Sequence, residues 1–93
     1  MPQPKLLVIE DSASIAALIK KIGVSLGFRV TVVETLAELK QTIADNKDFF
    51  VATIDYALPD AQNGEAISYV LDNGIPGLVM TGKMDLATRQ QIL

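Results

Sequence analysis

Short apolar runs alternate with stretches of helical periodicity along the whole chain, and this alternation constrains the fold more than any other feature. Four runs rich in Val, Ile and Leu occupy residues 5–10, 28–33, 50–55 and 77–81. Such runs are typical of parallel strands that are buried on both faces. Because strands and helices alternate, the sequence predicts an α/β fold with a parallel sheet and right-handed crossovers.

The first helix is predicted between the first two apolar runs. Ser12 or Ser14 can accept a hydrogen bond from its first turn, as N-cap residues do. Gly27 is placed to end the helix, since glycine readily adopts the left-handed conformation found after helix ends. Five apolar residues recur at helical spacing, and we expect them to face the core: Ile15, Leu18, Ile19, Ile22 and Leu26.

Three further helices are predicted, near residues 35–45, 64–72 and 85–93. Thr35 and Glu38 have the spacing of a capping box. No Gly, Asn or Pro closes the last helical pattern, so we expect residues 1–93 to be a single domain that continues in the natural protein with another strand and helix. The inward-facing residues are expected to be Leu36, Leu39 and Ile43 in the second helix, and Ile67, Val70 and Leu71 in the third.

Composition excludes several kinds of site. The sequence contains no cysteine and no histidine, so disulfides, thiolate or His-ligated metal sites and His-dependent triads are ruled out. With eight basic and eleven acidic residues, we expect neither nucleic acid nor a membrane surface as a partner. The N-terminus lacks the apolar core of a signal peptide, and no run approaches membrane-spanning length. We therefore expect a cytoplasmic protein.

Carboxylates follow two of the predicted strands. Glu10 and Asp11 end the first apolar run, and Asp55 ends the third, which cannot continue past Pro59. In a doubly wound sheet of order 2-1-3-4 these two strands are neighbours, and ligands bind in the crevice at their carboxyl ends. Clustered carboxylates repel one another, and Mg²⁺ with oxygen ligands relieves that repulsion. Thr81, after the fourth strand, adds a hydroxyl to the same edge.

Each acidic feature also has a structural explanation. The helix dipole favours acidic residues at a helix N-terminus, which would account for Glu10 and Asp11. An aspartate can cap the turn that follows it, which would account for Asp55. The metal site differs from both of these structural explanations in one respect, because only the metal site requires the three side chains to lie together.

Four motifs in register resemble those of the receiver domains of two-component response regulators. The resemblance covers essentially the whole chain and implies the flavodoxin-like three-layer fold, with strand order 2-1-3-4 here and a fifth strand and helix beyond this chain. The motifs are Leu7-Val8-Ile9-Glu10-Asp11-Ser12, Ile54-Asp55-Tyr56-Ala57-Leu58-Pro59-Asp60, Gly64 and Val79-Met80-Thr81-Gly82.

The resemblance implies a phosphorelay role. Asp55 would be the phosphoacceptor and would take a phosphoryl group from a histidine kinase or a phosphotransfer protein. Asp11, Glu10 and Asp55, with the backbone carbonyl of Ala57, would bind Mg²⁺. The domain would act as a signalling switch without turnover of an external substrate, would pass its signal to a downstream output domain, and could form a homodimer.

The resemblance also assigns the remaining motif residues. Thr81 would be the switch hydroxyl that holds a phosphoryl oxygen, and Gly82 the small neighbour that leaves room for the phosphoryl group. Pro59 and Gly64 match the loop that carries the acceptor, which is one residue longer here than the family pattern. The lysine and switch aromatic that the family places on its fifth strand lie beyond this chain.

Three other functions compete with this interpretation. A phosphatase similar to the haloacid dehalogenases would need a second acid where the chain has Ala57. A flavin or nucleotide site would need a Gly- or Ser/Thr-rich loop, whereas Glu10 and Asp11 would repel phosphate. The main alternative is a receiver-like module that is never phosphorylated and serves in docking or dimerisation.

Overall fold

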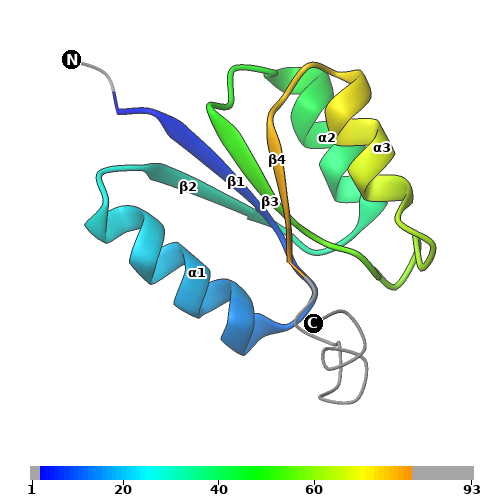
Figure 1. Cartoon of the computed structure of the whole chain (residues 1–93), viewed down its shortest axis with the longest axis horizontal. Helices are drawn as coiled ribbons and strands as arrows, with labels where there is room; N and C mark the ends of the chain where they lie inside the picture. Colours follow the sequence, from blue (N-terminus) through cyan, green and yellow to red (C-terminus); the bar gives the residue numbers. More distant parts are fainter. Residues whose placement is uncertain (1–2, 81–93) are drawn as a thin grey trace, which may run out of the picture.

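The computed structural model describes residues 3–80, in which parallel strands and helices alternate (Figure 1). The elements are β1 (Lys5–Ile9), α1 (Ala13–Ser25), β2 (Arg29–Val33), α2 (Leu36–Asp45), β3 (Val51–Asp55), α3 (Glu65–Asp72) and β4 (Gly77–Met80). The sheet has the order β2-β1-β3-β4, and this confirms the predicted order. The predicted helix near residues 85–93 lies outside the described residues, as do Thr81 and Gly82.

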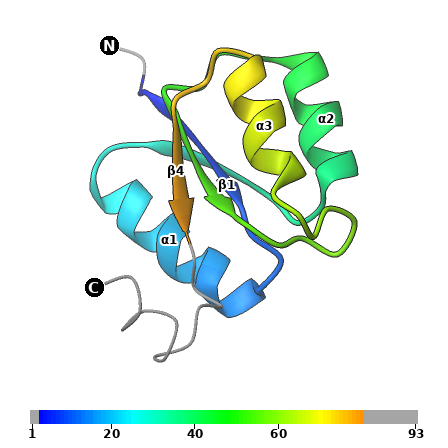
Figure 2. The same cartoon turned by 45° about the vertical axis from the view of Figure 1, so that its right-hand side comes forward.

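The sheet separates two layers of helices. Helix α1 covers one face, and α2 and α3 lie side by side on the other (Figures 1 and 2). Because side chains alternate along a strand, β1 contributes to both layers. Leu7 and Ile9 join the core beneath α2 and α3, while Leu6 and Val8 pack with Ala16 of α1. In the part of the chain from residue 3 to residue 80, no helix is long and apolar enough to cross a membrane.

Helix α1 rests on the sheet through small residues, which the sequence did not indicate. Ala16 and Gly23 are its buried residues. A Cβ atom added to Gly23 would lie 2.7 Å from Cδ2 of Leu6 and 3.1 Å from Cγ2 of Val30, so the helix approaches too closely for larger side chains. The prediction that the large apolar stripe faces inward is wrong for three residues, whose exposed fractions are 58% for Leu18, 51% for Ile22 and 71% for Leu26.

The ends of the helices agree with the sequence prediction more closely than the buried face of α1 does. Ser12 is the N-cap of α1, and its hydroxyl accepts a hydrogen bond from the Ile15 amide at 3.4 Å. Thr35 is the N-cap of α2 and accepts from the Glu38 amide at 3.1 Å. Gly27 has a φ of +94°, as expected for the residue that terminates a helix. In α3, Val70 is buried as predicted, whereas Leu71 is exposed.

Candidate functional site

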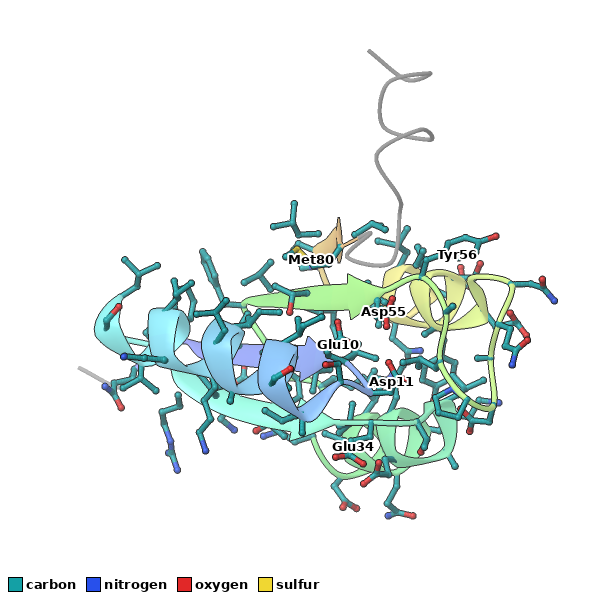
Figure 3. The ribbon with its side chains drawn as sticks, turned by 90° about the horizontal axis from the view of Figure 1, so that it is seen from below. Glu10, Asp11, Glu34, Asp55, Tyr56 and Met80 are labelled. Atoms are coloured by element: carbon teal, nitrogen blue, oxygen red, sulfur yellow. The ribbon has the colours of Figure 1, made fainter. Side chains whose placement is uncertain are left out.

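Three carboxylates meet at the carboxyl edge of the sheet. Asp55 is the last residue of β3, and Glu10 and Asp11 follow directly after β1. The two strands are paired with Ile9 opposite Ile54, so the residues that follow them lie next to each other. One carboxylate oxygen from each of the three residues lies within 4.8 Å of the others. Figure 3 shows these labelled side chains grouped at the ends of the strands.

Burial perturbs the Glu10 carboxyl. Both Glu10 and Asp55 are only 3% exposed. The pKa of Glu10 is raised from 4.5 to about 7, mainly by loss of solvation and also by the hydrogen bond and negative charge of Asp55, while the Ser12 amide acts in the opposite direction. That amide donates to Oε2 of Glu10 at 3.1 Å. Without a cation, this site therefore disfavours the fully ionised cluster.

The donor set fits a small divalent cation. Carboxylate oxygens are the ligands that Mg²⁺ prefers, and it is commonly held by few carboxylates plus water. A cation would also relieve the repulsion that raises the Glu10 pKa. The fourth predicted ligand is the backbone carbonyl of Ala57, and the amide of the same residue donates to Oδ1 of Asp55 at 3.3 Å.

The loop of residues 56–64 follows Asp55 and leads from β3 to α3. Leu58 and Ala61 exchange two backbone hydrogen bonds of 3.0 and 3.1 Å, and both are buried in the core. Pro59, predicted as a loop residue, lies in the short turn between them and is exposed. Gly64 starts α3 with a φ of +79°, and a Cβ atom there would lie 2.8 Å from Cε2 of Tyr56. Gly64 is therefore required both by its backbone conformation and by the adjacent ring.

Asp60 has a structural role that its sequence motif did not indicate. Its Oδ1 accepts a hydrogen bond from the Leu36 amide at 2.7 Å, and its Oδ2 accepts one from the Ala37 amide at 3.0 Å. Both amides belong to the first turn of α2. These bonds lower the pKa of Asp60. An aspartate beside a turn proline was a weak indication of a cap, but nothing in the sequence showed that its partner helix begins 24 residues earlier.

Strand β4 reaches the same edge. Met80, its last residue, is paired with Asp55 across the sheet, and the two are labelled together in Figure 3. The predicted switch residues Thr81 and Gly82 follow Met80 and lie outside the described residues. The structure thus brings together Glu10, Asp11, Asp55 and Ala57.

Comparison with known proteins gives matches among solved structures. No family model matches the chain, and no curated protein sequence matches it. A protein described as a two-component system response regulator/GGDEF domain protein is 32% identical, with a TM-score of 0.72 over 97% of this chain. The signal receiver domain of a modulated diguanylate cyclase from Desulfovibrio desulfuricans G20 is 26% identical, with a TM-score of 0.74 over 96% of this chain.

A third structure shares the fold alone. The MaeR response regulator bound to beryllium trifluoride is 15% identical, with a TM-score of 0.75 over 96% of this chain. The chain spans 36% of the GGDEF protein, 73% of the diguanylate cyclase fragment and 75% of MaeR.

Proposed function

Because this chain has the receiver-domain fold of response regulators, we propose that it is a phosphoacceptor domain of two-component signalling. Asp55 accepts a phosphoryl group from the histidine of a kinase or of a phosphotransfer protein, in a step that depends on Mg²⁺. The observation that carries this proposal is the cluster of Glu10, Asp11 and Asp55, whose oxygens lie within 4.8 Å of one another at the ends of β1 and β3.

Each residue of the site has a separate role in phosphoryl transfer. A carboxylate oxygen of Asp55 forms a bond to phosphorus, the phosphorus–nitrogen bond of the donor breaks, and its electron pair returns to the donor imidazole. Glu10 and Asp11 would hold the cation, and the Ala57 amide orients the Asp55 carboxylate through its bond to Oδ1. When bound, Mg²⁺ would neutralise charge on the phosphoryl oxygens during in-line transfer.

Phosphorylation then acts as a switch and not as one step of an enzymatic cycle. The new charge at Asp55 biases a pre-existing conformational equilibrium at the edge where β4 ends, and Thr81 follows directly there. An output domain in the full-length protein would read that change, in the cytoplasm. The MaeR response regulator, which shares this fold, is described as bound to beryllium trifluoride.

The first test is phosphorylation measured by intact mass. The chain is incubated with a small acyl-phosphate donor, with and without Mg²⁺, alongside Asp55→Asn and the control Asp48→Asn, which changes an exposed aspartate outside the cluster. We expect one phosphoryl group on the wild type and on the control only with Mg²⁺, and none on Asp55→Asn. Equal labelling of Asp55→Asn would contradict the proposal. No labelling of a folded wild type would favour the docking or dimerisation module.

A further inference from the structure

We infer that Asp60 is a positioning residue that fixes the loop of residues 56–64 to α2 and thereby holds Ala57 against Asp55. The inference rests on the proposed function, since it concerns how the same site is kept in the geometry needed for the cation. It starts from the two hydrogen bonds between Asp60 and the first turn of α2.

The link to α2 is suited to a carboxylate. The first amides of a helix have no partner within the helix, and the helix dipole attracts negative charge to that end. Asp60 uses both oxygens, at 2.7 Å to the Leu36 amide and 3.0 Å to the Ala37 amide. Thr35 satisfies the next amide, that of Glu38. The start of α2 is thus capped partly by its own N-cap and partly by the acceptor loop.

The same link restrains the turn that follows Ala57. Leu58 and Ala61 pin the base of the turn through their buried side chains and paired backbone bonds. Pro59 and Asp60 form its exposed tip, and Pro59 has a fixed φ. With Asp60 bound to α2, the tip cannot swing away from the helix. Asp55 in β3 and the buried Leu58 hold the ends of the segment that contains Ala57, and the bonds of Asp60 to α2 add a restraint on the turn that follows it.

Loss of the hydrogen bonds between Asp60 and α2 should make Ala57 more mobile while every side chain of the acidic cluster stays in place. The Ala57 amide would then leave Oδ1 of Asp55 more often, and its carbonyl would be less well placed for the cation. Groups that orient metal ligands typically change metal affinity by 10–100-fold when they are removed. For a loop restraint at the exposed tip we expect the lower end of this range, about tenfold.

The test compares Asp60→Ala with Thr35→Ala in the full chain. Both variants remove a side-chain cap from the first turn of α2, but only Asp60→Ala detaches the loop. Amide hydrogen exchange at Ala57 and the Kd for Mg²⁺ alone are measured for each. We expect Asp60→Ala to speed Ala57 exchange and weaken Mg²⁺ binding about tenfold, whereas Thr35→Ala changes each by less than about twofold. Asp60→Asn keeps one acceptor oxygen, so its effects on Ala57 exchange and on the Kd for Mg²⁺ should lie between those of Asp60→Ala and Thr35→Ala.

The outcomes separate this inference from the proposed function. If Asp60→Ala and Thr35→Ala change Ala57 exchange and Mg²⁺ binding equally, Asp60 is only a helix cap and the inference is overturned. A wild type that binds no Mg²⁺ and is not labelled would overturn the proposed function. In that case Ala57 exchange in the two variants still decides whether Asp60 holds the loop.

Discussion

At the scale of single residues, Glu10 shows how strongly the fold can change a carboxyl group. It follows β1 directly, is 3% exposed, and interacts with the carboxylate of Asp55. Its amide still donates to the Val33 carbonyl at 3.0 Å, so its backbone is held by the neighbouring strand β2. Burial of the side chain is the main reason why its pKa is raised to about 7.

Without Mg²⁺, the stability of the chain should decrease as the pH rises from about 5 to about 8. The pKa of Glu10 is about 7 in the folded state against 4.5 as the ordinary value, so folded Glu10 keeps a proton that the unfolded chain loses in this window. Its stabilising contribution is complete below the unfolded pKa and is lost as the pH passes the folded one. Because the site lies at the edge of the sheet, we expect a loss on the order of 1 kcal/mol.

Urea unfolding of the wild type and of Glu10→Gln, each in a chelator, measures this contribution at several pH values. The neutral glutamine cannot titrate, so its stability should change less across the window, and the difference between the two chains isolates Glu10. Parallel pH profiles would show that Glu10 does not titrate in this range. Saturating Mg²⁺ should reduce the loss in the wild type, because a cation favours the ionised carboxylate.

At the scale of elements, α1 shows that close packing can override a hydrophobic pattern. A helix stripe of Ile and Leu usually faces the core, but here the buried residues of α1 are Ala16 and Gly23, and of the stripe Ile19 packs partly buried against the same cluster. Gly23 lies directly over Leu6 and Val30. The small side chains let the backbone of α1 approach β1 and β2, and this rotates much of the larger stripe toward the surface.

Substitution of Gly23 by valine should therefore destabilise the chain by about 1–3 kcal/mol, the usual range for overpacking in a well-packed core. Even the Cβ atom would lie 2.7 Å from Leu6 Cδ2, and valine adds two more atoms. Ala17→Val is the matched control, because it places the same β-branched residue at an exposed position of α1. Thermal or urea unfolding of both variants gives the comparison, and equal effects would mean that α1 does not approach the sheet this closely.

At the scale of the whole molecule, the two faces of the sheet are covered unequally in the described part of the chain. The face under α2 and α3 carries the larger buried cluster, which includes Leu39, Ile43, Ile54 and Val70. The face under α1 carries a smaller one built on Leu6, Val8 and Ala16. Most of the packing energy that holds residues 3–80 together therefore lies on the α2 and α3 side.

Two leucines that occupy similar positions in their helical patterns should therefore differ in how much they contribute to the free energy of unfolding. Leu39 of α2 has no exposed surface and Leu18 of α1 is 58% exposed. We expect Leu39→Ala to lower the free energy of unfolding by about 2–5 kcal/mol, because it leaves a cavity in the core. Leu18→Ala should change it by less than about 1 kcal/mol, as is usual for surface sites. Similar losses in denaturant unfolding would show that the outer side of α1 is covered.

The sequence by itself was sufficient for the strand order and for the meeting of Glu10, Asp11 and Asp55. Local patterns predicted the strands and helices, the handedness of strand–helix–strand connections left few topologies possible, and the resemblance to receiver domains implied the order 2-1-3-4 that places the three carboxylates together. The tertiary structure alone decided which face of α1 is buried, how far the pKa of Glu10 rises, and that Asp60 binds the start of α2. Each of these depends on distances between segments that are remote in the chain, and hydrophobic periodicity carries no information about such distances.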